Sequence, residues 1–414
     1  MAPGVDSGDT AWMFAATALV LLMTPALGLF YAGLVRSKNT LNTFMMCVAA
    51  LSVATICWAA VGYSLAFDGD AGFIGGLGNA FLHDVTFAPR VGTHIPHLLF
   101  FAFQATFCIV TTALVSGAVV ERMRFGPFLV FAGLWSILVY SVMAHWAFGG
   151  GFLQAHGTLD FAGGVPVEMA SGFSALAAAL AVGARRDWGR LALLPHNAVY
   201  VLLGAGLLWF GWFGFNGGSG FSTGNASVLA FVNTLLTPAF TLATWFALDA
   251  IRSRQVTAIG AATAIVVGCV GITPAAGYIS PGWAMALGVI AALPSYAVIM
   301  LRPRSRVDET LDVLAAHGVA GFTGILFIGF FAEKSWNGVS DGLFYGNASQ
   351  LGHQALAALV APVYAFCATF VLLKVMSRFM ALRVQDGEEG LGLDIVSHGE
   401  EAYPAGEGAI LVPV

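Results

Sequence analysis

Long hydrophobic segments recur along the chain and are separated by shorter polar segments that carry most of its charge. Each hydrophobic segment has roughly 20 residues, the length of an α-helix that crosses a ~30 Å hydrocarbon layer at 1.5 Å per residue. Eleven such helices are expected, near residues 11–34, 41–67, 98–119, 127–147, 162–184, 196–216, 227–250, 257–278, 283–301, 313–333 and 354–377. A membrane β-barrel would instead show ~10-residue segments of alternating hydrophobic and polar residues. The pattern predicts an all-α integral membrane protein with about eleven transmembrane helices.

The composition supports this class, because 58% of the residues are hydrophobic and 9% are charged, against about 25% charged in ordinary soluble domains. The net charge of −5 over 414 residues indicates no nucleic-acid partner. The five cysteines all lie in hydrophobic segments, and their odd number argues against a disulfide framework or a metal cluster. The sequence shows no nucleophile elbow, phosphate-binding loop or metal-ligand cluster. We therefore expect neither an enzyme nor a cofactor.

The positive charges predict the orientation of the chain in the membrane. If the eleven helices alternate in direction, fifteen of the seventeen Lys and Arg residues fall on one side, and only Arg90 and Lys334 fall on the other. Because the positively charged side is normally cytoplasmic, we expect the N-terminus outside, the C-terminus inside and a plasma-membrane location. The first residues lack a basic region and a cleavage site, so no signal peptide is expected. Residues 1–383 are interpreted as the transmembrane domain and 384–414 as a cytoplasmic tail.

Three ionisable residues lie at or near membrane depth, where a charge costs about 2.5–3.5 kcal/mol even on a lenient scale. Asp160 precedes the fifth predicted helix, in LDFAGGVPVEMASG. Its carboxylate could simply accept backbone N–H groups at the helix N-terminus. Alternatively, it could supply a negative field near an outer cation site.

Glu168 lies eight residues after Asp160, about 12 Å deeper if that segment is helical. His317 lies near the start of the tenth predicted helix, among small apolar residues. A single buried histidine often has a structural role only. Two titratable groups in helices five apart instead favour a pore between two halves of the protein. We predict that the two side chains lie within direct or single-water hydrogen-bond distance.

A set of aromatic residues accompanies these groups. Phe103 and Phe107 are four residues apart and share one helix face, as do Phe215 and Ser219 if their helix persists. The ordinary explanation of such phenylalanines is packing or lipid contact. Aromatic faces with one hydroxyl group can also replace the hydration of a small monovalent cation, through cation–π attraction and a hydrogen bond.

At these segments the chain resembles the ammonium transporter, methylammonium permease and Rhesus family, and is most similar to its ammonium transporter branch. The motifs that carry the resemblance are TPALGLFYAGLVRSKN, QATFCIVTTALVSGAVVERMRF, AHWAFGGGFL, LDFAGG, GAGLLWFGWFGFNGGS, ITPAAGYISP, LDVLAAHGVAGFTG and GLDIVSHGEEAY. They extend from near the start of the chain to its tail, and several are long.

The resemblance implies a homotrimer in the lipid bilayer, in which each subunit has its own pore and two inverted five-helix halves plus one helix. It implies that Phe107 and Phe215 form a gate, and we expect their rings to stack. It also implies that Ser219 lies at an outer recruitment site, with Phe103 and Phe107 nearby and Asp160 stabilising it. His317 would be one of two pore histidines that conduct ammonium or ammonia. The tail is similar to the family's regulatory tail, which suggests a PII-type signalling protein or a signalling domain as a partner.

Two residues depart from the family pattern. Phe148, in AHWAFGGG, replaces the usual tryptophan of the outer site and removes its indole N–H and its strongest cation–π face. Glu168 replaces the first pore histidine, as in some fungal methylammonium permeases. With His317 it could form a Glu⁻/HisH⁺ pair, share one proton, or hold a cation directly and relax discrimination against potassium.

Three functions are consistent with the sequence. The first is transport of ammonium or methylammonium, with a Glu–His pair as proton relay. The second is an ammonium-sensing receptor that signals through its tail, which the two departures favour. The third is a Rhesus-like channel for neutral gas, which fits Phe148 but not the other motifs.

Overall fold

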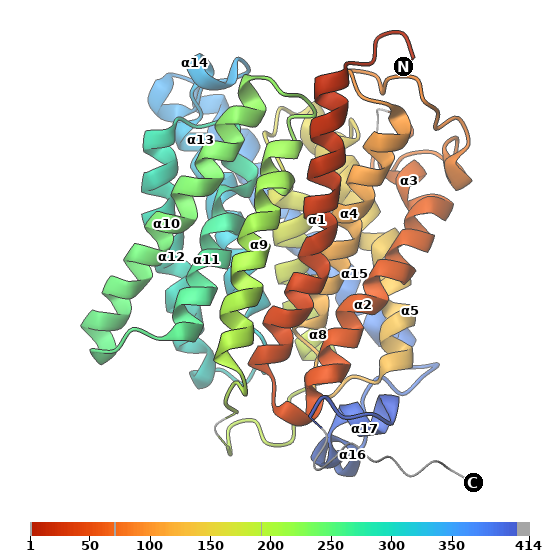
Figure 1. Ribbon diagram of the computed structural model, residues 1–414, viewed down its shortest axis with the longest axis vertical. Coiled ribbons are helices and arrows are strands. Elements are labelled where there is room, and N and C mark those ends of the chain that lie inside the picture. The colour runs from red at the N-terminus through yellow and green to blue at the C-terminus, as the bar shows by residue number, and fades with distance from the viewer. Residues whose placement is uncertain (1, 70–71, 192, 404–414) are drawn as a thin grey trace.

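The computed structural model describes residues 2–69, 72–191 and 193–403, and within them eleven helical spans are long and apolar enough to cross a membrane (Figure 1). The spans are α1 (Ser7–Leu34); η1 (Ser37–Asn39), α2 (Thr40–Cys57), η2 (Trp58–Gly62) and α3 (Tyr63–Phe67); α4 (His97–Ser116); α5 (Phe125–Trp135), η4 (Ser136–Tyr140), α6 (Ser141–Phe148) and α7 (Phe152–Ala155); η5 (Gly164–Met169) and α8 (Ala170–Val182); α9 (Ala198–Gly218); α10 (Asn225–Ser253); α11 (Ala258–Ile272) and η6 (Thr273–Ala275); α12 (Pro281–Leu301) and η7 (Arg302–Arg304); η8 (Leu314–Val319) and α13 (Ala320–Phe331); and α15 (Ala348–Met376). The predicted class and number of helices are confirmed.

The remaining elements are short and lie outside the spans. They are η3 (Ala80–Leu82), α14 (Lys334–Asn337), η9 (Leu343–Tyr345), α16 (Asp386–Leu391) and α17 (Leu393–His398). The start of α1 and the tail helices α16 and α17 lie at opposite ends of the helix bundle, and α14 lies at the same end as the start of α1 (Figure 1). We call these the N-terminal end and the C-terminal end of the bundle.

Two predicted helix boundaries were wrong by more than five residues. The fourth span continues through α7 to Ala155 instead of ending near 147, and α15 begins at Ala348 instead of near 354. The first turns of α15 contain glutamines that hydropathy alone assigns to a loop. In the fold they are buried: Gln354 exchanges two 2.8 Å hydrogen bonds with the backbone of Leu159. The polar side chain therefore stabilises the helix end by pairing with a distant segment.

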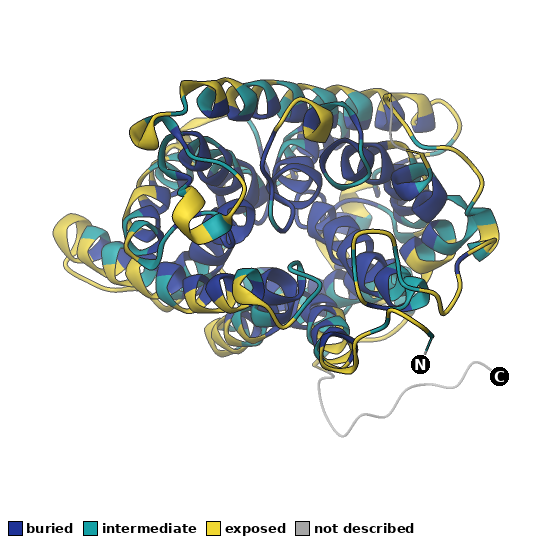
Figure 2. Cartoon of the chain, turned by 90° about the horizontal axis from the view of Figure 1, so that it is seen from above, coloured by how far each residue is buried: buried dark blue, intermediate teal, exposed yellow. Residues whose placement is uncertain are grey.

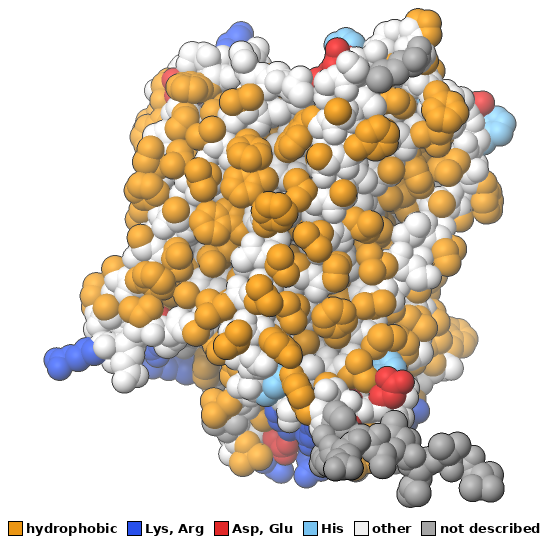
Figure 3. Space-filling model, in the orientation of Figure 1, with side chains coloured by type: hydrophobic (Ala, Val, Ile, Leu, Met, Phe, Trp, Pro, Cys, Tyr) orange, Lys and Arg blue, Asp and Glu red, His pale blue; other side chains and the backbone are white. Residues whose placement is uncertain are grey.

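The surface agrees with a lipid environment. Viewed from above, buried residues occupy the inner faces of the helices and exposed ones the rim (Figure 2). On the face shown in Figure 3, hydrophobic side chains cover the middle of the bundle, and charged side chains lie towards its two ends. Exposed large apolar residues such as Phe14, Ile56, Leu203 and Leu359 would be costly in water, whereas hydrocarbon accommodates them.

The fifth and tenth spans have corresponding construction, as expected for two related halves. Each begins with a π-helical turn, η5 or η8, and has a carboxylate eight residues before its buried ionisable residue. In both spans that carboxylate accepts a backbone N–H five residues along: Asp160 from Val165 at 2.7 Å, and Glu309 from Leu314 at 3.1 Å.

The two spans approach closely where glycines face each other. A Cβ atom on Gly172 would lie 2.2 Å from the backbone nitrogen of Gly318, and one on Gly321 would lie 2.5 Å from the Cβ of Glu168. Any larger residue would separate the backbones. The small residues thus determine how closely Glu168 and His317 approach.

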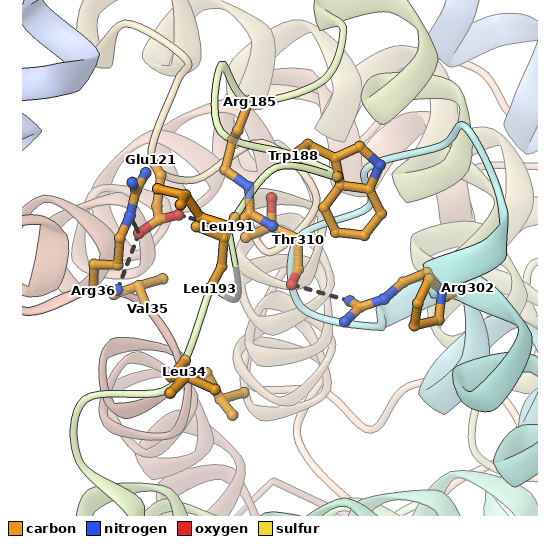
Figure 4. Close-up of a pocket in the computed structure, with 13 residues that line it drawn as sticks. Leu34, Val35, Arg36, Glu121, Arg185, Trp188, Leu191, Leu193, Arg302 and Thr310 are labelled. Atoms are coloured by element: carbon orange, nitrogen blue, oxygen red, sulfur yellow. Dashed lines mark hydrogen bonds and ion pairs between the residues drawn. The ribbon is translucent and has the colours of Figure 1, made fainter.

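A buried ion-pair network lies at the C-terminal end of the bundle, in the loops that join the spans (Figure 4). Arg185 donates to Glu121 at 2.6 Å and to Asp308 at 2.8 Å, and Arg36 donates to Glu121 at 3.0 Å. Burial alone raises the pKa of both carboxyls, but the adjacent guanidinium groups outweigh it, so the pKa of Glu121 and that of Asp308 fall below their ordinary values.

The tail helices pack against the same end of the bundle. The buried carboxylate of Asp394 accepts the backbone N–H groups of Leu41 and Asn42 at 3.1 and 2.8 Å, at the start of α2. Glu389 forms a 2.7 Å ion pair with Arg383. The part of the predicted tail from 404 to 414 lies outside the described residues.

Candidate functional site

A cavity of about 640 Å³ opens at the N-terminal end of the bundle. Its lining includes Phe107, Phe148, Asp160 and Ser219, all of which the sequence analysis assigned to an outer site. We call this cavity the vestibule. Phe103 is not among its lining residues: it is fully buried, and its ring lies 4.9 Å from that of Phe107 and 5.7 Å from that of Phe221, which does line the vestibule.

Asp160 lies in the turn that begins the fifth span. Its carboxylate accepts the backbone N–H groups of Gly163, Gly164 and Val165 at 2.7 to 3.0 Å. Gly163 has a φ of +118°, a conformation that favours glycine and lets the chain fold back over the carboxylate. Burial raises the pKa of Asp160 to about 6, although the three N–H donors oppose the rise. The carboxylate thus caps the helix and, at neutral pH, also gives the vestibule a negative charge.

The hydroxyl group of Ser219 donates a 2.8 Å hydrogen bond to the carbonyl oxygen of Phe215, one turn earlier. Its proton is therefore committed to the helix backbone, and the oxygen lone pairs remain available as acceptors. Because Ser219 lines the vestibule, it can accept a hydrogen bond from an N–H donor there.

Two stacked rings separate the vestibule from the interior. The rings of Phe107 and Phe215 lie 4.0 Å apart between centroids, with 26° between their planes. Both are almost fully buried. The predicted stacking is confirmed, and a hydrated ion cannot pass between rings in this arrangement.

Beyond the rings, Glu168 and His317 meet in a small cavity of about 10 Å³, which is near the lower limit for one water molecule. The Nδ1 atom of His317 lies 2.8 Å from Oε2 of Glu168, and both side chains are buried. The predicted contact is confirmed. The other carboxylate oxygen, Oε1, is buried and has no hydrogen-bond partner in the described residues.

The rest of this cavity is apolar. Its lining residues are Met23, Leu27, Val110, Leu114, Val167, Leu208, Trp212 and Phe215, in addition to the pair. A charge entering it would lose most of its hydration. The carboxylate and the imidazole are therefore the groups that can exchange a proton or a hydrogen bond with a solute there.

Sequence reasoning missed several residues of this path, among them Gln104, Arg90 and Tyr31. Gln104 lines the vestibule and has a buried amide oxygen without a partner in the described residues, and Arg90 also lines it. Tyr31 lies one turn beyond Leu27, and its hydroxyl donates to the carbonyl of Leu114 at 3.0 Å, so it lies beside the small cavity on the C-terminal side. The motifs QATF and GLFYAG contain Gln104 and Tyr31, but neither residue has a charge that would single it out.

The described residues contain no group of three or more His, Cys, Asp and Glu side chains that could hold a metal ion. The groups of the site that can interact favourably with a cation include aromatic rings, the Ser219 hydroxyl, the carboxylates of Asp160 and Glu168, and the imidazole of His317. Such groups suit a small cation with N–H donors.

The comparisons with known proteins agree with this chemistry. Residues 11–403 match the model of the Ammonium Transporter Family. The chain belongs to the ammonium transporter family. An ammonium transporter of Bacillus subtilis (strain 168) is 44% identical over 402 residues, covering 96% of this chain and 99% of the relative. A putative ammonium transporter of Methanothermobacter thermautotrophicus is 42% identical over 406 residues, covering 96% and 99%.

Solved structures of this family share the fold. Candida albicans Mep2 is 36% identical with a TM-score of 0.88, covering 93% of this chain and 88% of that chain. A structure described as a sensor Amt protein is 28% identical with a TM-score of 0.88, covering 94% and 98%. Members of the family are membrane transporters rather than enzymes.

We expect Asp160→Asn to weaken both folding and ammonium binding, and Ser219→Ala to weaken binding alone. The first change disturbs an acceptor of three backbone N–H groups, at a cost of about 1–3 kcal/mol, whereas the Ser219 hydroxyl caps one carbonyl that the helix can satisfy. Thermal unfolding in detergent and ammonium binding by calorimetry would measure the two effects. An equal loss of thermal stability in both variants would contradict the division.

Proposed function

We propose that the chain transports ammonium or ammonia, and accepts methylammonium, through a pore within each subunit. The observation that carries the proposal is the Glu168–His317 pair in a narrow apolar cavity directly beyond the stacked rings of Phe107 and Phe215. Burial of a carboxylate with one unpartnered oxygen costs free energy unless a proton, a cation or an N–H donor compensates it. Transport of a protonated amine supplies such a partner.

Recruitment takes place in the vestibule. An ammonium ion has four N–H donors. Ser219 accepts one, the faces of Phe107 and Phe148 attract the cation, and the charge of Asp160 lowers its energy. Because Phe148 lacks an indole N–H, recruitment is weaker than with tryptophan at that position.

Proton transfer takes place at the pair. Ammonium gives one proton to the Glu168–His317 pair and becomes neutral ammonia, which the apolar cavity accommodates. The pair, now carrying one more proton, releases it towards the C-terminal end, where ammonia takes it up and ammonium forms again. The pair can begin as Glu⁻/HisH⁺ or as GluH/His, because the two arrangements contain the same number of protons.

We also propose that the protein is a homotrimer in the plasma membrane, with its N-terminus outside. The resemblance to the family and the segregation of Lys and Arg support this arrangement. Native mass spectrometry from detergent would measure the subunit number. A monomer under conditions that preserve transport would contradict it.

The decisive test is the current recorded from proteoliposomes on a supported membrane when ammonium is added. A saturable current that persists with methylammonium and is absent from empty liposomes supports charged transport. Saturable ammonia flux without current would instead support a Rhesus-like neutral channel. Ammonium binding without flux or current would support a receptor.

The receptor is the second candidate, because the sensor Amt protein shares this fold over 94% of the chain. In that case the vestibule binds ammonium as proposed, and the tail transmits the signal to a PII-type protein or a signalling domain. The binding and current measurements above distinguish the two functions.

We propose that the tail is regulatory in either case. Asp394→Asn should weaken the contact of α17 with α2, because a charged acceptor of two N–H groups contributes about 1.5–3 kcal/mol, equivalent to roughly ten- to hundredfold faster hydrogen exchange of the tail. Glu401→Gln, at an exposed position, is the matched control. Faster exchange with an unchanged current would show that docking has no regulatory role.

A further inference from the structure

Arg90 introduces a positive charge into a cavity proposed to recruit cations. It lies in the loop before α4 and lines the vestibule together with Asp160; these two are the charged side chains among the described lining residues. Of the seventeen Lys and Arg residues, it is one of the two that fall on the N-terminal side of the membrane when the eleven helices alternate in direction. No carboxylate of the described chain lies within 4.0 Å of it as an ion-pair partner.

The guanidinium group is held by the protein instead of extending into water. Its Cζ atom lies 5.5 Å from the centroid of the Phe100 ring, and Nη2 donates to the carbonyl of Phe67 at 3.3 Å. The backbone N–H of Arg90 donates to Ile95 at 3.0 Å, and Thr93 donates back to the Arg90 carbonyl at 2.9 Å. The loop is thus a closed turn that directs this side chain to one ring.

That ring belongs to the aromatic wall of the vestibule. Phe100 lies 5.1 Å from Phe221, Phe221 lies 5.7 Å from Phe103, and Phe103 lies 4.9 Å from the gate residue Phe107. Phe100, Phe107 and Phe221 all line the cavity. When a cation binds to these aromatic faces, the face of Phe100 is already occupied by the guanidinium group of Arg90.

We propose that Arg90 is a tethered cation that competes with incoming monovalent cations for the aromatic wall, and so lowers the affinity of the outer site. This inference rests on the proposed function in one respect, namely that ammonium enters through the vestibule. A compact cavity of 640 Å³ is about 11 Å across. A unit positive charge ~10 Å from a monovalent cation lowers the local cation concentration about twofold at the dielectric constant of water. At the effective dielectric constant of a protein surface the reduction is roughly tenfold, before screening by salt.

The first experiment measures the ammonium concentration that gives half-maximal current for the wild type, Arg90→Gln and Lys334→Gln. Lys334 is the matched control, because it is the other basic residue of this end and does not line the vestibule. Arg90→Gln should lower the half-saturating concentration about two- to tenfold at low salt, with a smaller effect at 0.5 M sodium chloride. An equal effect of the two substitutions would overturn the proposal.

The second experiment does not require transport. Arg90→Ala removes the tethered group, so guanidinium ion at low millimolar concentration should bind the freed ring and raise the thermal midpoint of this variant more than that of the wild type. Urea, a neutral molecule of the same shape, should give no difference. In current recordings guanidinium should also return the half-saturating concentration of Arg90→Ala towards the wild-type value.

The outcomes separate the two proposals. Absence of any ammonium-induced flux or current in the wild type would refute the transport function, while guanidinium binding would still test the competition. If Arg90→Ala does not fold, Arg90→Gln serves in both measurements, since its amide can keep the bond to Phe67. Equal responses of wild type and variant to guanidinium would overturn the inference.

Discussion

Glu168→Gln is expected to reduce the ammonium current by at least about tenfold, because general acid–base groups typically contribute 10²–10⁴-fold to a proton transfer. The amide keeps the size of the side chain and can still contact His317, whose Nδ1 lies 2.8 Å from the native carboxylate. It cannot accept the proton of ammonium. Binding in the vestibule should be unchanged, because Ser219 and Asp160 lie on the other side of the stacked rings.

Glu168→His provides the complementary variant. A pair of neutral imidazoles offers no fixed negative charge, so selectivity for ammonium over potassium should increase relative to the wild type. Both currents must come from the same preparation, with ammonium binding measured separately by calorimetry. A wild-type current with unchanged selectivity in Glu168→Gln would exclude the carboxylate from conduction.

Arg185→Met is expected to destabilise the fold by about 3–5 kcal/mol, the range observed when one partner of a buried ion pair is removed. Arg185 is 6% exposed and contacts both Glu121 and Asp308, which have almost no exposure. The substitution leaves two buried carboxylates without their shared cation. Unfolding in mixed detergent micelles titrated with SDS would measure the change in free energy.

The pH dependence gives this prediction a second readout. The folded-state pKa values of Glu121 and Asp308 are lowered, so their contribution to stability is present above their unfolded values near 4 and is lost as the pH falls through the lowered values. The difference between wild type and Arg185→Met should therefore be large at neutral pH and shrink below about pH 4.

Arg186→Gln is the matched control, because its side chain is about half exposed and its ion pair with Asp187 at 3.4 Å lies near the surface. Exposed pairs contribute about 0–1 kcal/mol. A similar loss of stability in the two variants, or a loss in Arg185→Met that does not depend on pH, would show that the buried network is not the cause.

The local sequence predicted those features of the fold that depend on whether water or hydrocarbon surrounds a segment. Hydrophobic length was sufficient for eleven spans, because a backbone in hydrocarbon must satisfy its own hydrogen bonds and a helix is the local way to do so. It was insufficient at the start of α15, where Gln350 and Gln354 make a helix end polar. Their partners lie about 195 residues away in the sequence.

Asp160, Glu168 and His317 could be identified as candidates from the sequence, because burying a charge costs free energy. The contact between Glu168 and His317 follows from the close crossing of their helices at Gly172 and Gly318. The sequence did not rank Phe103 below Phe221 as a lining residue. Phe103 is a residue of α4, whereas Phe221 lies in the turn after α9, whose conformation the hydrophobic pattern does not predict.

The sequence by itself determined the membrane class, the number of spans, the segregation of positive charge and the ionisable residues at depth, since each follows from the free energy of transfer of a segment or side chain into hydrocarbon. Tertiary structure alone decided that Glu121 and Asp308 share Arg185, and that Arg90 rests on an aromatic ring. These contacts join residues far apart in the chain, and their geometry depends on how closely the helices pack.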